Sequence, residues 1–433
     1  RLPRRTGGDR AAAERLVSGD RRARAALLVL LLVATVLRVA AALATGEREL
    51  RGDEGYYVET ATMLVQEGRH PGAFRPPGYA GFVAGVLWAS GGNLAAVRWA
   101  QAALSLLVVA VVFDVVRRRF GTGPAFVSGL LCATSPTVVH YTQLFWSETL
   151  VTVGLCAVVW CFDRLDATAR PVWGVLAGLA LGVSALAREM YAYLSPAVAA
   201  CLLPGARDER RVRLASGALL VVAAVAVVLP WAMRNQRVLG RFELATNRWL
   251  PIAAGNLPSA DGTLLGVADE RSIIGPYNRT DDPLVAEEMA RRVALENIAA
   301  QQPWWIVLKI VRSTYFLYAP VSQLGRFVER GWLLHGHPGA GYALLRLEQA
   351  HYALLMVLGI AGLWLVPGGR TQLLAVLLIL FHMAVYVLAN ANHRFRVPLL
   401  PLFALYAGPL VFGRVARDAW WRARLGGAAV CLT

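Results

Sequence analysis

The chain is poor in charged residues and almost lacks lysine. Only 17% of its 433 residues are charged, and Lys309 is the only lysine, so the formal charge of +16 comes almost wholly from arginine. Soluble domains have about 25% charged and roughly 45–50% apolar residues, whereas 57% of this chain is apolar. The composition therefore argues against a string of soluble domains and favours one bundle of helices in a membrane.

Cysteine is also scarce, which bears on metal chemistry. There are five cysteines; apart from Cys431 they lie in apolar runs, without the spacing of a zinc site (Cys132, Cys156, Cys161 and Cys201). We expect these four to be buried as small hydrophobic side chains. The basicity does not indicate a nucleic-acid partner, because the arginines cluster at the ends of apolar runs, as they do in membrane proteins.

Apolar length predicts an all-α polytopic membrane protein with about ten spans. A transmembrane helix needs about 20 consecutive apolar residues, although some of the candidates are shorter. The candidate spans lie near residues 25–45, 95–116, 123–139, 143–162, 171–187, 190–204, 213–231, 350–366, 371–389 and 397–413. The charged N-terminal segment lacks a convincing cleavage site, so we interpret the first span as a retained helix.

Arginine placement predicts the orientation of these spans. Clusters precede the first span, follow the second, separate the sixth from the seventh, and follow the last. Cytoplasmic loops carry the excess of arginine in membrane proteins, so both tails, 1–24 and 414–433, are predicted to be cytoplasmic. The arginines of these clusters are Arg21, Arg22, Arg24, Arg117, Arg118, Arg119, Arg207, Arg210, Arg211, Arg213, Arg414, Arg417, Arg422 and Arg424.

The arginine-rich, lysine-poor usage is typical of a GC-rich bacterium, so we expect the bacterial cytoplasmic membrane.

This orientation divides the chain into modules and loops. An N-terminal transmembrane module, 25–231, contains a first outer loop, 46–94; a long outer loop, 232–349, precedes the C-terminal spans, 350–413. The first outer loop is expected to hold two surface helices, one from Tyr56 and one from Gly78.

One apolar stretch in the long outer loop, 304–319, is predicted to lie at the membrane surface. Lys309 and Arg312 interrupt it, and a charge at the bilayer centre costs at least ~2.5–3.5 kcal/mol on insertion scales. An amphipathic interfacial helix therefore fits better than a span.

Two motifs in the first outer loop carry candidate functional residues. Asp53, Glu54 and Tyr57 begin the first surface helix. The carboxylates can cap that helix, or one can act as a general base or metal ligand with its pKa raised by partial burial. Arg75 precedes two prolines at a rigid turn, where it can anchor the interface or bind phosphate through its guanidinium.

Further candidates lie in other turns predicted to face outside. His140 and Glu148 flank the turn between the third and fourth spans, and Arg188 ends the fifth. An acidic residue entering a membrane span indicates a functional site, although Glu148 can also cap its helix. His140 is either structural or, with Asp53 and Glu148, a candidate metal ligand.

The late motifs add more basic residues on the same side. Arg234 follows the seventh span, and His393, Arg394 and Arg396 lie between the last two spans. Arginines on the outer face break the positive-inside trend, and either lipid headgroups or a phosphate-bearing ligand can account for them. Charged groups from several loops thus converge on one face, which favours an enzyme that takes its substrate from the lipid over a transporter with charges at mid-membrane.

These motifs, in this order, resemble those of the bacterial GT-C glycosyltransferases, a group that includes protein O-mannosyltransferase-like enzymes and lipid A aminoarabinose transferases. The resemblance covers about residues 25–413 and rests on Asp53–Glu54, the turn at Arg75, Glu148, the segment through Arg234 and the turn at Arg394. It implies a GT-C-like transmembrane helix bundle and a polyprenyl-phosphate sugar as donor. It also implies that the first-loop acid is the base or a metal ligand, with a divalent cation as a cofactor in some members.

The resemblance implies a membrane glycosyltransferase that inverts the anomeric carbon on the outer face of the cytoplasmic membrane. Asp53 is then the expected base, with Glu54 beside it, and Arg75, Arg394 and Arg396 stabilise the leaving lipid phosphate. Two alternatives remain: a flippase or transporter for lipid-linked sugars, and a non-catalytic subunit of an envelope-glycan assembly complex. The sequence identifies neither the sugar nor the acceptor, which could be a glycan, a lipid or a protein.

Overall fold

A computed structural model describes residues 7–415 except 46–47, 51, 205–208, 258–272, 321 and 335. In these ranges the chain is helical, and β-structure is confined to an isolated bridge between Thr45 and Leu333. The predicted all-α class is confirmed. Expectations that involve Arg207, Arg417, Arg422, Arg424, Cys431 and the far ends of the two tails lie outside the described residues.

In the described part of the chain, five helices are long and apolar enough to cross a membrane, by length and composition. Helix α1 contributes its segment Asp20–Ala44. The five helices are α1 (Gly7–Ala44), α4 (Leu94–Phe120), α10 (Arg210–Leu239), α16 (Pro338–Leu365) and α17 (Gly369–Leu388). The predicted count of ten spans is therefore not confirmed.

The other predicted spans are short, interrupted or charged. Ser135 caps a new helix that starts at Pro136, which splits the span predicted at 123–139. The span predicted at 190–204 is a 3-10 turn followed by six residues of α-helix. These elements are α5 (Thr122–Ala133), α6 (Pro136–Tyr141), α7 (Glu148–Thr168), α8 (Pro171–Ala187), η1 (Glu189–Leu194), α9 (Ser195–Ala200), η3 (His393–Leu399) and α18 (Leu400–Val411). Proline and charge thus break apolar runs that length alone predicts to be continuous.

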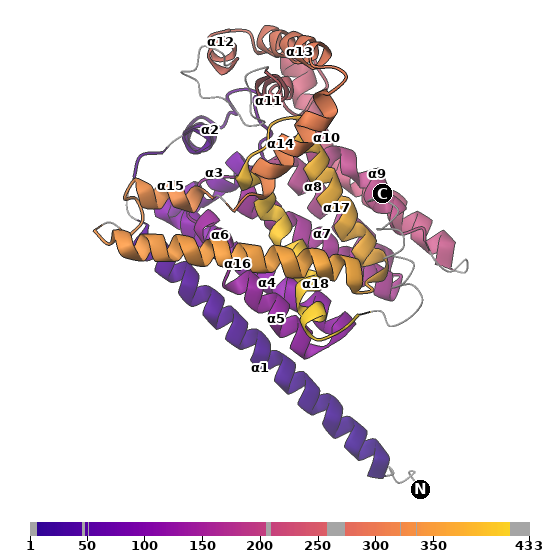
Figure 1. The fold of residues 1–433 in the computed structure, drawn as a ribbon. Coiled ribbons are helices and arrows are strands. Elements are labelled where there is room, and N and C mark those ends of the chain that lie inside the picture. Colours follow the sequence, from indigo (N-terminus) through magenta and orange to yellow (C-terminus); the bar gives the residue numbers. More distant parts are fainter. Residues whose placement is uncertain are drawn as a thin grey trace.

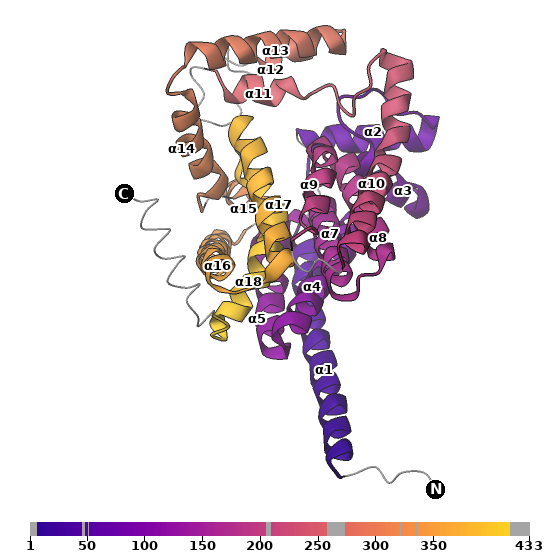
Figure 2. The same ribbon diagram turned by 90° about the vertical axis from the view of Figure 1, so that its right-hand side faces the viewer.

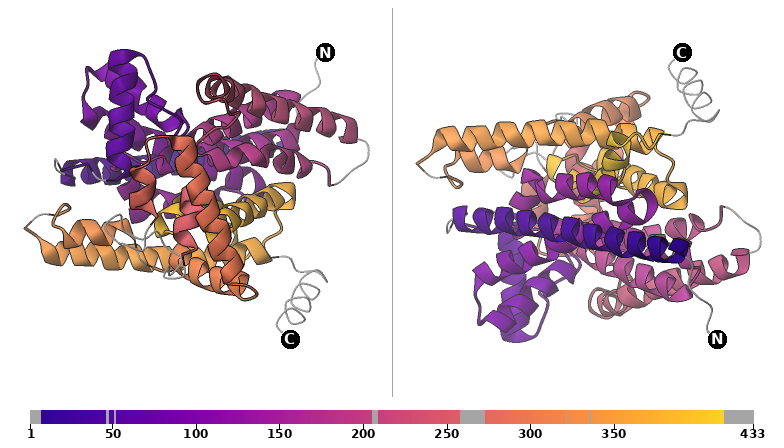
Figure 3. Two further views of the ribbon diagram at one scale, coloured as in Figure 1. Left: turned by 90° about the horizontal axis from the view of Figure 1, so that it is seen from above. Right: turned by 90° about the horizontal axis from the view of Figure 1, so that it is seen from below.

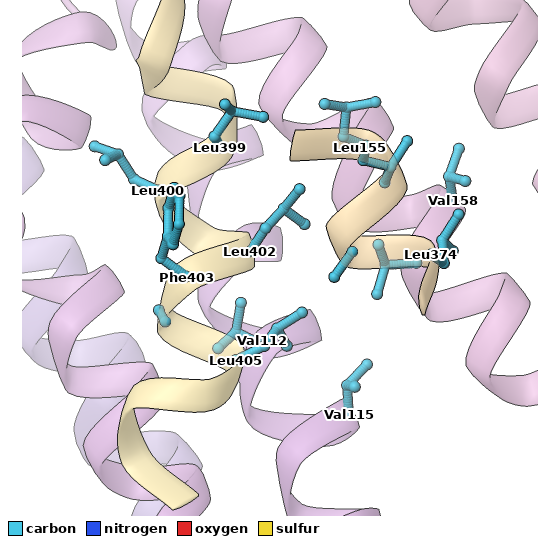
Figure 4. Packing of buried hydrophobic residues seen from close by; sticks show 14 of the residues in the cluster. Val112, Val115, Leu155, Val158, Leu374, Leu399, Leu400, Leu402, Phe403 and Leu405 are labelled. Carbon is cyan, nitrogen blue, oxygen red and sulfur yellow. The ribbon is translucent and has the colours of Figure 1, made fainter. Parts of the chain in front are cut away.

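The main core forms where α4, α7, α17 and α18 meet. Figure 4 shows Leu402 and Leu405 of α18 close to Val112 of α4, with Leu155 of α7 and Leu374 of α17 nearby; all five are buried. The predicted burial of Cys132, Cys156, Cys161 and Cys201 is confirmed. In Figure 3, α1 lies along one side of this bundle, where it packs on α4 and α5.

Small residues let the α8 and α10 backbones approach closely. Gly174, Gly178 and Gly182 repeat at every fourth position of α8, and a Cβ atom at Gly178 would lie 2.2 Å from the Leu220 carbonyl oxygen of α10. Such spacing is typical of helix pairs in membranes, where close van der Waals contact replaces the hydrophobic effect as the driving force.

Arginines from two of the clusters predicted to be cytoplasmic meet at one end of the bundle. Arg119, at the end of α4, forms ion pairs with Asp163 and Asp166 of α7. Arg213 of α10 and Arg370 of α17 also pair with Asp166. These contacts join the ends of α4 and α7 to the starts of α10 and α17.

The segments predicted to be outer loops gather at the other end. Figures 1 and 2 show α2 and α11–α13 far from the N-terminus of α1. The helices of these loops are α2 (Asp53–Glu67), α3 (Gly78–Ser90), α11 (Trp249–Gly255), α12 (Ile274–Asn278), α13 (Pro283–Ala300), α14 (Trp305–Tyr318) and α15 (Gln323–Glu329). The surface helices predicted from Tyr56 and Gly78 correspond to α2 and α3.

Helix α14 has the amphipathic character predicted for 304–319. Lys309 and Ser313 are buried against the protein, whereas Val307 and Val311 are exposed. Lys309 donates to the carbonyl oxygens of Gly255 and Ala389. One polar stripe of α14 therefore faces the protein, and most of its outward side is apolar, with Arg312 exposed next to Val311. This arrangement suits a helix at a lipid surface.

Candidate active site

Asp53 forms the centre of a charged cluster at the loop end of the bundle. It is the first residue of α2 and follows Gly52, whose φ of 56° lies in the left-handed region that favours glycine. Its Oδ1 accepts a hydrogen bond of 2.7 Å from Arg75 Nη2, and its Oδ2 lies 2.7 Å from Arg394 Nη1. One carboxylate thus joins two arginines that are more than 300 residues apart in the sequence.

Arg75 reaches Asp53 because the turn that carries it is held tightly. The turn ends at Gly78, the first residue of α3, where a Cβ atom would lie 2.6 Å from the Leu186 backbone. The Arg75 guanidinium lies 5.3 Å from the Tyr57 ring centroid and donates to the Tyr57 hydroxyl at 3.3 Å. Tyr57 therefore orients Arg75 and is itself buried.

A second ion pair lies beside the first. Glu148, in the first turn of α7, has only 1% of its side chain exposed, and its Oε1 accepts a hydrogen bond from Arg188 Nη2. Arg394 Nε lies 3.8 Å from the same Oε1 atom. Arg394 thus contacts both carboxylates, while Glu148 Oε2 has no hydrogen-bond partner among the described residues.

Arg188 is fixed by groups from three segments. It donates to the Ser147 hydroxyl at 3.2 Å and to the Tyr386 hydroxyl of α17 at 2.5 Å, in addition to Glu148. Its guanidinium also lies 5.0 Å from the Phe395 ring centroid. The sequence made Arg188 a secondary candidate for substrate binding, with a local ion pair at the helix end as the other interpretation, and the structure places it inside the cluster.

The cluster has an excess of positive charge. Arg75, Arg188 and Arg394 surround the two carboxylates of Asp53 and Glu148, and all five side chains are at least three-quarters buried. Burial alone would raise the pKa of Asp53, but Arg75 and Arg394 outweigh it and hold that pKa below its usual value. Asp53 is therefore ionised, and the net charge of +1 favours an anionic ligand.

Glu54 lies apart from this cluster. Both of its carboxylate oxygens accept hydrogen bonds from Arg48, and Oε1 also accepts from the Phe145 backbone N–H at 3.1 Å. Arg48 in turn lies over the Phe327 ring. This geometry corrects the sequence-based expectation of a catalytic Glu54: it connects the start of α2 to the α6–α7 turn and to α15, and thereby orients Asp53.

Arg396 is also displaced from its predicted role. It is 2% exposed and donates to the carbonyl oxygens of Leu317 and Ala319 at the end of α14. Its guanidinium lies 3.8 Å from the Tyr352 ring centroid. Instead of forming a phosphate clamp with Arg394, Arg396 binds the carbonyl end of a helix, where a cation is favourable.

His393 precedes Arg394 and is partly buried among cations. Burial and the nearby Arg396, Arg326 and Arg394 lower the pKa of His393 to about 3. The ring is therefore neutral, and within the part of the chain that the structure describes its Nε2 atom has no hydrogen-bond partner. The structure places His393 next to the cluster but gives it no contact with Asp53 or Glu148.

Arg234 and His140 occupy positions outside the cluster. Arg234 donates to the carbonyl oxygens of His70 and Gly72, and so holds the chain that leads into the Arg75 turn. The His140 ring is buried and packs edge-on against Phe327. Both positions indicate a structural contribution rather than contact with a ligand.

Some contributors were not predicted from the sequence. Arg48 and Tyr386 lie in segments without a distinctive motif, and only the three-dimensional contacts with Glu54 and Arg188 identify them. Trp146 lies inside the motif that contains Glu148, and Arg394 stacks at 5.0 Å from its ring centroid. The sequence signal that could have identified Trp146 is its position two residues before Glu148, an acidic residue at the start of a predicted span.

An apolar groove of about 1380 Å³ ends next to the cluster. It runs along α16 and α17 from Gly369 to Met383 and includes Tyr318 of α14. At a rise of 1.5 Å per residue, this length of α17 is about 21 Å. Tyr318 and Met383 also pack against Tyr386 and Phe395, which contact Arg188 and Arg394.

The cluster does not fit a resident divalent metal. A cation would add to an existing excess of positive charge, and both oxygens of Asp53 already bind arginine. In the described part of the chain, histidine, cysteine, aspartate and glutamate nowhere form a group of three that could hold a metal. His140, the third candidate ligand, packs against Phe327.

Comparisons with known proteins support the predicted resemblance. Residues 74–233 match the family model described as dolichyl-phosphate-mannose-protein mannosyltransferase, and this segment includes Arg75, Glu148 and Arg188. A comparison with curated protein sequences found no match.

Solved structures share the fold at low sequence identity. The oligosaccharyltransferase AglB from Archaeoglobus fulgidus, in complex with an inhibitory peptide and a dolichol-phosphate, has a TM-score of 0.54 and 12% identity over 95% of this chain. The same protein in complex with zinc and sulfate has a TM-score of 0.52 and 13% identity over 94% of this chain. ArnT from Cupriavidus metallidurans, bound to undecaprenyl phosphate, gives a TM-score of 0.46 and 16% identity, covering 93% of this chain and 63% of ArnT.

The chain spans about half the length of the oligosaccharyltransferase, 54% and 51% in these two structures. At this level of identity the likeness concerns the fold. The membrane bundle with its helical outer loops is the GT-C fold, as the sequence motifs predicted.

Proposed function

We propose that this chain, which has the fold of the GT-C glycosyltransferases, transfers a sugar from a polyprenyl-phosphate donor to an acceptor at the outer face of the cytoplasmic membrane. The observation that carries the proposal is the convergence of Arg75, Arg188 and Arg394 on two carboxylates at the end of an apolar groove. A buried cationic cluster next to an apolar channel is suited to a ligand with a phosphate head and a hydrocarbon tail. The dolichol-phosphate in the AglB complex is consistent with such a ligand.

The groove is the proposed site for the prenyl chain. Its lining from Gly369 to Met383 is almost wholly apolar, and it leads to Tyr386 and Phe395 beneath the arginines. The prenyl chain would reach this groove from the lipid, where van der Waals contact rather than the hydrophobic effect holds apolar groups together. The groove would therefore align the chain, while the arginines set the position of the phosphate and supply the charge-assisted contacts.

The proposed reaction is a single in-line displacement. The acceptor hydroxyl gives its proton to the Asp53 carboxylate while its oxygen attacks the anomeric carbon. The bond between that carbon and the phosphate oxygen breaks, and polyprenyl phosphate leaves with the electron pair. Arg394 and Arg188 stabilise the charge on the departing phosphate, and the anomeric configuration is inverted.

Donor binding would also activate the base. While Arg394 is bound to Asp53 at 2.7 Å, the carboxylate is a weak base, because the ion pair holds its pKa below the usual value. A donor phosphate that takes over Arg394 would remove this stabilisation and add a negative charge nearby, and both changes raise the pKa of Asp53. Proton abstraction would then follow donor binding.

The alternative functions make a different prediction for Asp53. A flippase or a non-catalytic subunit needs no base, and the described spans place their clustered charges at the two ends of the bundle rather than at its middle. Asp53→Asn keeps the shape of the side chain and removes the base.

Purified Asp53→Asn protein, supplied with polyprenyl-phosphate sugars, should release polyprenyl phosphate roughly 10²–10⁴ times more slowly than wild type, the range for loss of a general base. Glu288→Gln, in the exposed ion pair with Arg291, is the matched control and should retain the wild-type rate. Undiminished release by Asp53→Asn would refute the catalytic assignment.

A further inference from the structure

A buried histidine behind the cluster connects it to the membrane bundle. His382, on α17, is 1% exposed and contacts two different segments. Its Nδ1 atom lies 2.6 Å from the Tyr191 hydroxyl, and its Nε2 atom lies 2.5 Å from the Phe395 carbonyl oxygen. Neither His382 nor Tyr191 has a part in the reaction proposed above.

The contacts of His382 determine which ring nitrogen carries the proton. A backbone carbonyl can only accept, so Nε2 must be protonated and donate to Phe395. In the neutral ring Nδ1 is then an acceptor, and the Tyr191 hydroxyl donates to it. Tyr191 therefore fixes the tautomer that His382 needs in order to hold Phe395.

The Phe395 carbonyl needs such a donor because of the local sequence. In a 3-10 helix each carbonyl accepts from the N–H three residues later. For Phe395 in η3 that residue is Pro398, which has no N–H. His382 supplies the missing hydrogen bond from another helix.

Phe395 lies between the two arginines that the proposed reaction uses. Its ring stacks on Tyr386 at 3.9 Å with an interplanar angle of 12°. The guanidinium groups of Arg394 and Arg188 lie 4.9 and 5.0 Å from the centroid of the same ring. A change in the position of Phe395 would therefore move both arginines relative to Asp53 and Glu148.

We propose that His382 is a positioning residue, whose Nε2–H holds the Phe395 backbone so that Arg394 and Arg188 meet the lipid phosphate. This inference rests on the proposed function for the identity of the ligand, but the positioning itself can be tested without it. His382 would act through Phe395, without contact with the donor or the acceptor.

Two polar substitutions separate positioning from general packing. A glutamine side chain can place an N–H near the position of Nε2 and keep the bond to Phe395, whereas an asparagine reaches only the position of Nδ1. Asparagine also leaves space in this buried site because it is one methylene shorter. His382→Leu is therefore the packing control, since leucine fills the site but removes both hydrogen bonds.

The first measurement is the affinity of full-length protein for undecaprenyl phosphate. We expect His382→Asn and His382→Leu to weaken binding at least tenfold, and His382→Gln to restore most of the affinity. In an Arg394→Ala background the same substitutions should have a smaller effect than in wild type, because only Arg188 is then left for them to displace. Equal losses for asparagine and glutamine, or a loss that is unchanged in the Arg394→Ala background, would overturn the proposal.

A second measurement needs no ligand. Phenylglyoxal labelling of Arg394, read by peptide mass spectrometry against the exposed Arg346, reports whether Arg394 stays in its ion pairs. Labelling should be faster in His382→Asn and His382→Leu than in wild type and His382→Gln. If wild-type protein does not bind undecaprenyl phosphate but this difference is seen, the proposed function fails and the positioning holds. Equal labelling in all four proteins would refute the positioning.

Discussion

Replacement of Arg394 by alanine should weaken binding of polyprenyl phosphate more than it destabilises the fold. In the structure, Arg394 bonds Asp53 at 2.7 Å and lies 3.8 Å from Glu148, with 18% of its side chain exposed. Hydrogen bonds to charged groups contribute about 1.5–3 kcal/mol. In wild type the Arg394 guanidinium gives up its bonds to Asp53 when it binds the phosphate, so its net contribution is less than the full value of two such bonds. We therefore expect Arg394→Ala to lose about 2 kcal/mol of binding free energy, which is roughly a 30-fold increase in Kd.

The effect of Arg394→Ala on stability should be smaller, because Asp53 keeps its hydrogen bond of 2.7 Å to Arg75. Glu148 likewise keeps Arg188, so no carboxylate is left without a cation, and we expect about 1 kcal/mol, the net value of one hydrogen bond. The assay is titration of detergent-solubilised protein with undecaprenyl phosphate, in parallel with thermal unfolding. Arg346→Ala, at an exposed site on α16, removes the same charge and should leave Kd unchanged. A Kd for Arg394→Ala within twofold of wild type, or an equal loss in Arg346→Ala, would refute the phosphate clamp.

Two further substitutions test how the cluster and the outer loops are held. Gly78→Ala should lower the free energy of unfolding by about 1–3 kcal/mol, as overpacking does, because its Cβ would lie 2.6 Å from the Leu186 backbone. The control is Gly81→Ala in the same helix, whose Cβ would meet no described atom within 4 Å and should not destabilise the protein. Equal thermal unfolding of the two variants would contradict the tight contact between α3 and α8. Burial raises the pKa of Glu287 from the usual 4.5 to about 7, although its carboxylate accepts a hydrogen bond from the Trp249 N–H. Between these two pH values the folded protein therefore binds more protons than the unfolded chain. Its stability falls as pH rises through this range. Glu287→Gln should therefore unfold at a higher temperature than wild type at pH 8 but not at pH 4.5. If the difference in unfolding temperature between the two proteins were the same at both pH values, the buried carboxylate of Glu287 would not be its cause.

Much of the site was predictable from the sequence, because a membrane restricts where charges can lie. Asp53, Arg75, Glu148, Arg188 and Arg394 each end or follow an apolar run, and the topology argument put them on one face. The structure brings all five together. Their positions relative to the predicted spans, together with the excess of arginine in cytoplasmic loops, were sufficient to predict that these five residues share one side.

The predicted roles of Glu54 and Arg396 were corrected by the structure, because each points in a different direction from its neighbour in the motif. Glu54 follows Asp53 directly, and Arg396 lies two residues after Arg394, so sequence spacing assigned each pair one role. A rotation of about 100° per residue in a helix separates adjacent side chains, and Glu54 meets Arg48 while Asp53 meets Arg75. Which member of a pair faces the site depends on tertiary contacts that spacing does not contain.

The predicted count of ten spans was not confirmed for a different reason. Apolar composition marks burial as well as lipid contact, and α18 is apolar because it is buried at the centre of the bundle. Its twelve residues are too short to cross a bilayer of about 30 Å alone. Length, and the prolines that interrupt apolar runs, therefore distinguish spans from buried helices better than hydropathy does.

The most direct measurement of the central claim is the identification of lipid that stays with the purified protein. Mass spectrometry of lipids extracted from wild-type protein should detect a polyprenyl phosphate or its sugar conjugate, and protein with both Arg75→Ala and Arg394→Ala should retain much less of it. Absence of polyprenyl phosphate from the wild type, or equal retention by the double variant, would contradict the assignment of the arginine cluster as a lipid-phosphate site.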